Sequence, residues 1–245
     1  MRGSRAPRRD DGGTVIDSAP METTTVPTRP QIAASLRRAP VIGVVRTSST
    51  EEAERQARLF ADSGLELVEI TFTVPGAAGL VRKLLAGRPS EGPPWFGMGT
   101  VTTAARAREA VLAGAEFFVT PNASPEVARE ARQAGLFLVM GALTATEVVA
   151  AHELGADIVK VFPLPPVGGP AYLKALRQPL GDIPMLASGG YGVEEIPAYA
   201  EAGASGFGIG APLLGADDAE TRRRIVRALE LATGRSRRPE SEETR

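Results

Sequence analysis

The chain has 245 residues, 28 basic and 29 acidic side chains and a formal net charge of −1. This balance provides no bulk field that would attract nucleic acid or an anionic membrane. Because the sequence has no cysteine and a single histidine, it excludes disulfides, thiolate metal sites, Cys-His catalysis and a multi-histidine metal centre.

Residues 1–28 are rich in Arg, Asp, Thr, Pro and Gly without hydrophobic periodicity, and we predict that they form a disordered tail. A basic arm for nucleic acid is the alternative, although acidic residues in the same segment offset its arginines. The tail has no apolar region typical of a secretory signal, and no later run is long enough to span a bilayer. We therefore expect a cytoplasmic protein that contacts neither membrane nor nucleic acid.

After a short predicted helix at residues 30–39, apolar strand-like runs alternate with alanine-rich amphipathic runs. The predicted strands are residues 41–46, 65–71, 95–99, 116–120, 136–140, 157–162, 183–187 and 206–209. The predicted helices are residues 50–63, 76–87, 103–113, 124–134, 144–154, 169–178, 192–202 and 217–233.

This alternation implies an α/β fold with a parallel sheet. Eight strand–helix units favour closure of that sheet into a (β/α)8 TIM barrel spanning residues 29–233. A doubly wound open sheet is the alternative. The charged and polar residues 234–245 are predicted to form a flexible C-terminal tail.

An isolated lysine lies in the middle of the sixth predicted strand. Side chains alternate along a strand, so Ile158, Lys160 and Phe162 share one face. If that face lines the barrel, Lys160 projects into a poorly solvated space that disfavours its charged form. A neutral amine is the nucleophile that forms a Schiff base with a ketone. The other two lysines, Lys83 and Lys174, fall in polar helical patterns. A structural or ligand-pairing lysine is the alternative.

The second predicted strand places a glutamate on what should be its inner face. By alternation, Glu69 shares this face with Leu67, Thr71 and Thr73. A buried carboxylate requires a nearby cation or a role in proton transfer. Lys160 is the obvious counterpart, either in a structural ion pair or in an acid/base pair.

Polar and glycine-rich segments follow several predicted strands, where the chemistry of such a barrel is found. Backbone N–H groups of Ser188-Gly189-Gly190 and of Gly206–Gly210 would suit a phosphate. The glycines of Gly97–Val101 would let backbone approach a ligand, or would form a turn without one. Arg46, at the end of the first strand, could bind a carboxylate or phosphate, or form a salt bridge at the rim.

Five stretches together resemble the motifs of the 2-keto-3-deoxy-6-phosphogluconate (KDPG) aldolase family. They are Glu69-Ile70-Thr71, Gly97-Met98-Gly99-Thr100-Val101, Val119-Thr120-Pro121-Asn122, Lys160-Val161-Phe162-Pro163 and Ser188-Gly189-Gly190. The resemblance covers residues 31–233. It implies a homotrimeric class I aldolase barrel without metal or other cofactor, which cleaves KDPG to pyruvate and glyceraldehyde 3-phosphate in Entner–Doudoroff metabolism.

The resemblance also implies a role for each matching position. Lys160 corresponds to the Schiff-base lysine and Glu69 to the general acid/base. Thr100 and Pro121 correspond to positions beside the pyruvyl portion of the substrate. The positions that correspond to the phosphate end are Ser188, Gly189, Gly190 and, more loosely, Gly210.

Three positions and one loop depart from the family pattern. Many members carry an arginine for the pyruvate carboxylate where this chain has Thr73, and we hypothesise that Arg46 replaces it. Met140 stands where proline is usual after the fifth strand. Residues 164–169 form a loop about one residue longer than usual. Ser188 stands where threonine is common, and its hydroxyl favours KDPG over the galactonate epimer. The alternatives are that epimer or 4-hydroxy-2-oxoglutarate as substrate, or a non-catalytic anion-binding paralogue.

Overall fold

The computed structural model describes residues 28–89 and 92–234. The two predicted tails lie outside these ranges, except for Thr28 and Gly234. These two residues cap the first and last helices of the fold, Thr28 at the start and Gly234 at the end.

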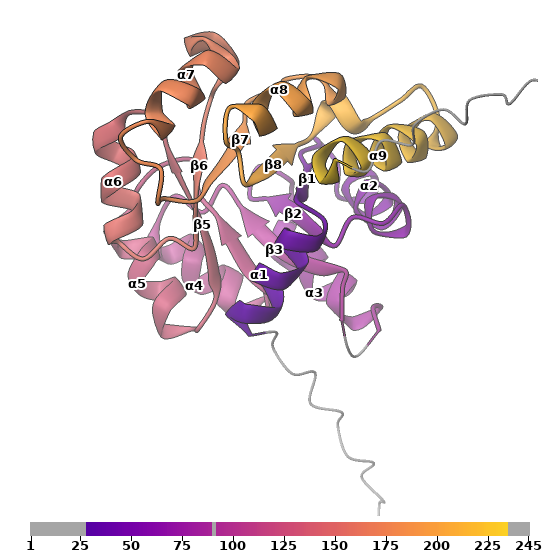
Figure 1. Ribbon diagram of the computed structural model, residues 1–245. Coiled ribbons are helices and arrows are strands. Elements are labelled where there is room, and N and C mark those ends of the chain that lie inside the picture. Colours follow the sequence, from indigo (N-terminus) through magenta and orange to yellow (C-terminus); the bar gives the residue numbers. More distant parts are fainter. Residues whose placement is uncertain (1–27, 90–91, 235–245) are drawn as a thin grey trace, which may run out of the picture.

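The described chain alternates strands and helices as its hydrophobic pattern predicts (Figure 1). The strands are β1 (Val41–Val45), β2 (Leu67–Thr71), β3 (Trp95–Gly99), β4 (Phe117–Val119), β5 (Phe137–Ala142), β6 (Ile158–Val161), β7 (Met185–Ser188) and β8 (Gly206–Ile209). The helices are α1 (Arg29–Arg38), α2 (Thr50–Asp62), α3 (Ala77–Ala86), α4 (Ala104–Leu112), α5 (Pro125–Gln133), α6 (Ala145–Glu153), α7 (Gly169–Arg177), α8 (Ile196–Glu201) and α9 (Asp218–Thr233). Short 3-10 turns are η1 (Pro165–Val167), η2 (Val193–Glu195) and η3 (Ala211–Leu213).

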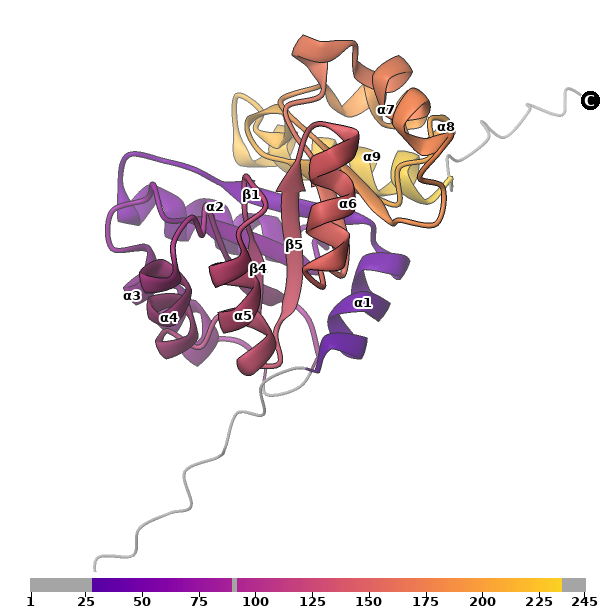
Figure 2. The same ribbon diagram turned by 90° about the vertical axis from the view of Figure 1, so that its left-hand side faces the viewer.

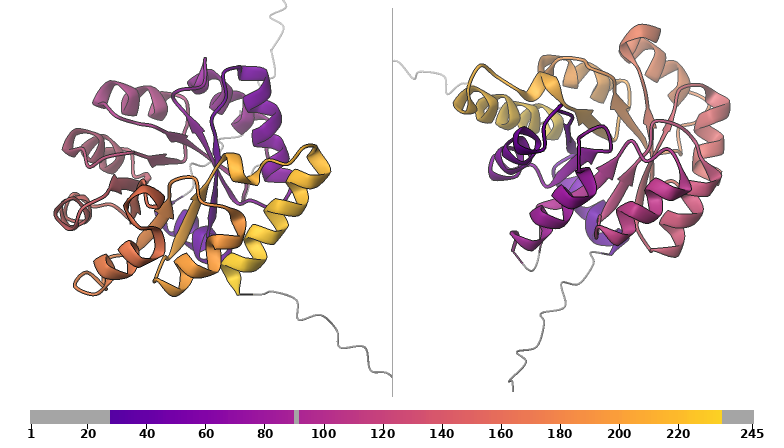
Figure 3. Two further views of the ribbon diagram at one scale, coloured as in Figure 1. Left: turned by 90° about the horizontal axis from the view of Figure 1, so that it is seen from above. Right: turned by 180° about the vertical axis from the view of Figure 1, so that it is seen from behind.

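All neighbouring strands pair in parallel, and β1 also pairs with β8, which closes the sheet into a barrel. Seen from above, the helices surround the strands (Figure 3). The predicted (β/α)8 barrel is therefore confirmed, and the open-sheet alternative is wrong.

The predicted helix 192–202 is divided into η2 and α8. Pro197 lies in the first turn of α8, where its missing N–H is tolerated.

Two apolar cores flank the strands. The inner core is formed largely by the first residues of strands, including Leu67, Trp95 and Ile158, and α1 adds Ile32 and Leu36 to it. Helix α1 therefore covers the end of the barrel at which the strands begin (Figures 1 and 2). The outer core joins strand residues such as Val68 and Ile70 to the surrounding helices. This division follows the predicted alternation and leaves the opposite end of the barrel for polar groups.

None of the helices in the described part of the chain combines the length and the apolar character needed to cross a bilayer.

Candidate active site

Buried polar side chains lie inside the barrel above the apolar inner core. Glu69 is 2% exposed and Lys160 is 8% exposed, and Thr71 and Ser188 are also buried. Strands β2 and β6 are four positions apart in the ring of eight, so Glu69 and Lys160 face each other across the interior. The sequence prediction that both point inward is confirmed, because Leu67 and Ile158, which share their strand faces, belong to the inner core.

Glu69 is held beside a glycine on the neighbouring strand. A Cβ atom at Gly99 would lie 2.5 Å from Cγ of Glu69 and would overlap its carboxylate. The glycine at position 99 therefore makes room for the side chain of Glu69. The sequence analysis had instead attributed this glycine to a close approach of the backbone to a ligand, or to a turn. Burial raises the pKa of Glu69, and the charges of Lys160 and Arg46 partly oppose that rise.

Lys160 and Glu69 do not form a direct ion pair. Within residues 28–89 and 92–234, no carboxylate oxygen lies within 4.0 Å of the Lys160 amine. The amine lies 5.3 Å from the centroid of the Phe162 ring, at a distance typical of a cation–π contact. The structural Glu-Lys pair considered from the sequence is therefore not formed.

Arg46 is anchored at the rim by a chain of hydroxyl groups. Its Nη1 donates to Thr73 Oγ1 at 3.2 Å, and its Nη2 approaches Thr100 Oγ1 at 3.5 Å. Thr73 and Thr71 hydroxyls are 2.8 Å apart, and Thr71 donates to the Val45 carbonyl at 3.1 Å. A hydroxyl has one proton, so the chain of donors runs from Arg46 through Thr73 and Thr71 to that carbonyl.

Arg46 has no carboxylate partner within the described ranges, which excludes the predicted salt bridge at the rim there. Beside it, Thr100 has a φ of 59°. No other non-glycine residue in the described part of the chain has a positive φ. Such strain persists where the surroundings fix the residue, and it concentrates at functional sites.

Arg46 and Lys160 line one cavity of about 260 Å³ with the predicted phosphate segments Ser188-Gly189-Gly190 and Gly210. Gly189 and Gly190 have φ values of 139° and 87°, which favour glycine. The Ser188 hydroxyl donates to the Gly208 carbonyl at 3.1 Å. The fold thus brings Arg46, Lys160 and a glycine loop to one small cavity. This arrangement is suited to a small anionic molecule.

Comparison with known proteins agrees with this arrangement. The family model for KDPG and KHG aldolase matches residues 32–227. The chain belongs to the KDPG and KHG aldolase family. It is therefore an aldolase, a lyase, and the resemblance inferred from its motifs is confirmed.

Individual relatives are also named as aldolases. The 2-dehydro-3-deoxy-phosphogluconate aldolase of Treponema pallidum is 33% identical over 165 residues, which is 67% of this chain and 77% of that protein. The 2-dehydro-3-deoxy-6-phosphogalactonate aldolase of Escherichia coli is 32% identical over 175 residues, which is 71% of this chain and 84% of that protein. The Zymomonas mobilis KDPG aldolase solved with 3-phosphoglycerate has a TM-score of 0.73 at 25% identity, covering 83% of this chain and 97% of that one.

Two further positions of the family pattern behave differently in the structure. Pro121 packs against Gly141, where a Cβ atom would lie 2.6 Å from the Asn122 nitrogen and would overlap the Pro121 carbonyl. Met140 is buried in the outer core, on the side of β5 that faces the helices. The departure at Met140 therefore lies outside the cavity, and it gives no support to a non-catalytic paralogue.

The sequence analysis did not single out Gln56, a buried residue of α2 that also lines the cavity. Its Nε2 donates to the Glu52 carboxylate at 2.7 Å. The available signal was a polar residue in the apolar face formed by Ala53, Ala57 and Phe60. Only the structure shows that this face reaches the aldolase cavity.

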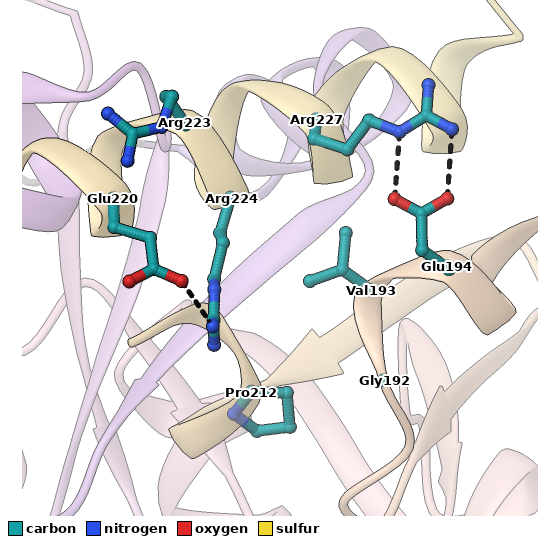
Figure 4. A pocket seen from close by; sticks show the side chains of 8 residues that line it. All are labelled: Gly192, Val193, Glu194, Pro212, Glu220, Arg223, Arg224 and Arg227. Carbon is teal, nitrogen blue, oxygen red and sulfur yellow. Dashed lines mark hydrogen bonds and ion pairs between the residues drawn. The ribbon is translucent and has the colours of Figure 1, made fainter. Parts of the chain in front are cut away.

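A larger groove of about 630 Å³ lies outside the barrel between η2 and α9 (Figure 4). Two ion pairs occupy its walls, Arg224 with Glu220 and Arg227 with Glu194. None of the predicted site residues lines it. The smaller cavity inside the barrel is therefore the candidate active site.

Proposed function

We propose that this aldolase cleaves KDPG to pyruvate and glyceraldehyde 3-phosphate through a Schiff base on Lys160. The observation that carries this proposal is the placement of Lys160 and Glu69. Both are buried, they face each other from β6 and β2, and no direct ion pair joins them. An amine and a carboxylate held apart in this way can work on a substrate carbon between them.

In the proposed reaction the Lys160 amine gives up a proton, attacks the C2 carbonyl and forms a carbinolamine, which loses water to give a protonated imine. The imine accepts the electron pair of the C3–C4 bond as the C4 hydroxyl loses its proton, and the aldehyde leaves. Protonation of the resulting enamine at C3 and hydrolysis release pyruvate. Glu69 would carry these protons, and its raised pKa brings it closer to the range useful for a group that both donates and accepts.

Substrate recognition is proposed to use the cavity that Arg46 and the glycine loop line, together with Thr100 and Pro121, which do not line it. Arg46 is oriented by Thr73 and Thr100 and would bind the carboxylate of the keto acid. Pro121 and Thr100 would lie beside the pyruvyl portion. Ser188, Gly189, Gly190 and Gly210 would bind the phosphate through backbone N–H groups. The Ser188 hydroxyl would join them by turning from the Gly208 carbonyl to which it now donates.

The galactonate epimer is a second candidate substrate, because the Escherichia coli relative named for it is nearly as similar as the relatives named for KDPG. Initial rates on KDPG, its galactonate epimer and 4-hydroxy-2-oxoglutarate decide between them. We expect the highest kcat/KM for KDPG, and a higher value for the epimer would replace our assignment.

Incubation with pyruvate and borohydride tests the Schiff base. We expect a stable mass adduct on Lys160 that is absent in Lys160→Arg. The matched controls are Lys83→Arg and Lys174→Arg, which alter the other two lysines and should retain the adduct. Tight anion binding without an adduct would indicate the non-catalytic paralogue. Loss of turnover in EDTA that metal restores would contradict the metal-free mechanism.

We further propose a homotrimer acting in the cytoplasm, in Entner–Doudoroff metabolism, as the family resemblance implies. Light scattering tests the assembly, with an expected mass three times the 25.6 kDa of one chain. A mass of one or two chains at working concentration would contradict it.

A further inference from the structure

A pair of tyrosines lies directly behind the glycine loop that ends β7. Tyr191 follows that loop in the sequence and is buried, and Tyr199 of α8 is buried beside it. Their ring centroids are 4.3 Å apart, with the planes inclined at 38°. Such a tilted aromatic pair is a rigid support, because it excludes water and restricts both rings.

The Tyr191 hydroxyl closes the loop on itself. It donates a hydrogen bond of 2.9 Å to the carbonyl of Ala187, and both groups are buried. This bond spans Ser188, Gly189 and Gly190, two of which have the positive φ angles that glycine adopts most freely. Without a cross-link, two adjacent glycines would allow the loop many conformations. Burial raises the pKa of Tyr191 well above its ordinary value, so the phenol stays a donor at any working pH.

The same loop supports the segment that follows the lysine strand. The Leu164 N–H donates to the Ser188 carbonyl at 3.1 Å. A Cβ atom at Gly189 would lie 2.8 Å from both the Leu164 nitrogen and Cδ of Pro165. Tyr199 reaches the far end of that segment, since a Cβ atom at Gly169 would lie 3.2 Å from its hydroxyl oxygen. The tyrosine pair therefore supports the glycine loop, which lines the cavity, and residues 164–169, which pack against that loop.

We propose that Tyr191 is a positioning residue for recognition of the substrate phosphate, acting through its hydrogen bond to Ala187. The bond holds the N–H groups of the glycine loop in the arrangement that a phosphate requires before the substrate arrives. This inference rests on the proposed function, which assigns the loop to the phosphate. It extends that function by naming a residue that touches no substrate atom and yet determines selectivity for the phosphorylated keto acid.

The test compares Tyr191→Phe with a matched control, Tyr172→Phe. Tyr172 also donates from its hydroxyl to a backbone carbonyl, that of Leu143 at 2.8 Å, on another part of the rim. Each variant loses one hydroxyl and keeps its ring. The readout is kcat/KM for KDPG divided by kcat/KM for 2-keto-3-deoxygluconate, the same keto acid without its phosphate.

We expect Tyr191→Phe to lower this ratio by about two- to tenfold, the range that corresponds to one lost hydrogen bond. The change should appear in KM for KDPG, while Tyr172→Phe keeps the wild-type ratio. A merely structural role would lower both values of kcat/KM together and leave the ratio unchanged. That result, or an equal fall in Tyr172→Phe, would overturn the proposal.

Calorimetric titration with inorganic phosphate gives a second readout that requires no turnover. Weaker phosphate binding in Tyr191→Phe than in Tyr172→Phe and wild type supports the inference, and equal binding in all three contradicts it.

Borohydride trapping of pyruvate in the same preparations separates the failure of the Schiff-base function from the failure of the role of Tyr191. Absence of the adduct in wild type would refute the Schiff-base function, whereas its presence with an unchanged ratio and unchanged phosphate binding would refute only the role of Tyr191.

Discussion

The carboxylate of Glu69 occupies the space that any side chain at position 99 would need. A Cβ atom at Gly99 would lie 2.5 Å from Cγ of Glu69 and would overlap the carboxylate itself. Glu69 of β2 is in register with Gly97 of β3, and Thr71 is in register with Gly99, so the Glu69 side chain reaches diagonally along the paired strands to Gly99. The glycine in the Gly97-Met98-Gly99-Thr100-Val101 motif therefore determines where the proposed acid/base stands.

Gly99→Ala should consequently act as a mutation of Glu69 without altering it. The added methyl group displaces the carboxylate, so we expect kcat to fall toward the loss expected for Glu69→Gln, about 10²–10⁴-fold. Steady-state rates on KDPG measure this loss. The control is Gly79→Ala in α3, where a Cβ atom meets nothing within 4 Å. Full activity in Gly99→Ala would show that the carboxylate position is not critical.

Replacement of Glu69 by glutamine should stabilise the fold while it removes turnover. Burial raises the pKa of Glu69 above its ordinary 4.5. The folded chain therefore binds this proton more tightly than the unfolded chain, and the free energy of unfolding falls as pH rises above that value. Glutamine does not ionise, so the stability advantage of Glu69→Gln should be small near about pH 4 and larger near about pH 8.

Thermal unfolding of wild type and Glu69→Gln across this pH range measures the effect. Glu147→Gln is a control of opposite sign, because N–H groups of Thr144 and Leu143 and the Thr144 hydroxyl lower the pKa of Glu147. Wild type should exceed Glu147→Gln in stability at neutral pH, and this difference should vanish as pH falls. A pH-independent difference for Glu69→Gln would mean that its carboxylate is not held in a desolvated site.

Arg46→Ala should raise KM for the keto acid more than it lowers kcat, if the arginine only binds the substrate carboxylate. Truncation of a charge-assisted hydrogen bond is expected to cost about 1.5–3 kcal/mol, or roughly 10- to 150-fold in KM. Arg37→Ala, on the exposed side of α1 at the other end of the barrel, is the matched control. An unchanged KM in Arg46→Ala would exclude Arg46 from the site.

Thr73→Val tests the hydroxyl chain that orients Arg46. Valine keeps the shape of threonine and removes the acceptor for Arg46 Nη1. We expect a smaller rise in KM than in Arg46→Ala, and no further rise when the two changes are combined, because both act through the same guanidinium. Additive effects would instead assign Thr73 a substrate contact of its own.

The barrel and its inward residues could be predicted because one rule, the alternation of side chains along strands, determines both. The rule placed Glu69 and Lys160 inside and Val68 and Ile70 outside, as the structure has them. It could not reveal that Gly99 serves Glu69, because that contact depends on the register of β2 against β3.

Contacts between distant segments escaped prediction for the same reason. From the sequence, Thr73 indicated only that the arginine common in the family is absent. In the structure its hydroxyl accepts a hydrogen bond from Arg46, 27 positions away in the sequence. From the sequence, Met140 indicated a change in the active site. In the structure its side chain lies in the outer core. Gln56 read as a helix residue, and only the three-dimensional arrangement brings it to the cavity.

The ion pair between Arg88 and Glu116 gives the last prediction, because it is buried at the end of the barrel opposite the site. Both side chains are 3% exposed or less. Glu116 also accepts the Phe96 N–H at 2.8 Å, and Arg88 stacks over the Trp95 ring at 5.2 Å. Removal of Glu116 leaves the Arg88 charge buried without its ionic partner, with only the Trp95 ring and backbone carbonyls around it, so Glu116→Ala should lower the free energy of unfolding by about 3–5 kcal/mol. Glu130→Ala, which removes a pair with the exposed Arg108, should change it by less than about 1 kcal/mol. Urea unfolding of both variants measures the contrast, and equal effects would mean that burial does not set the strength of the Arg88–Glu116 pair.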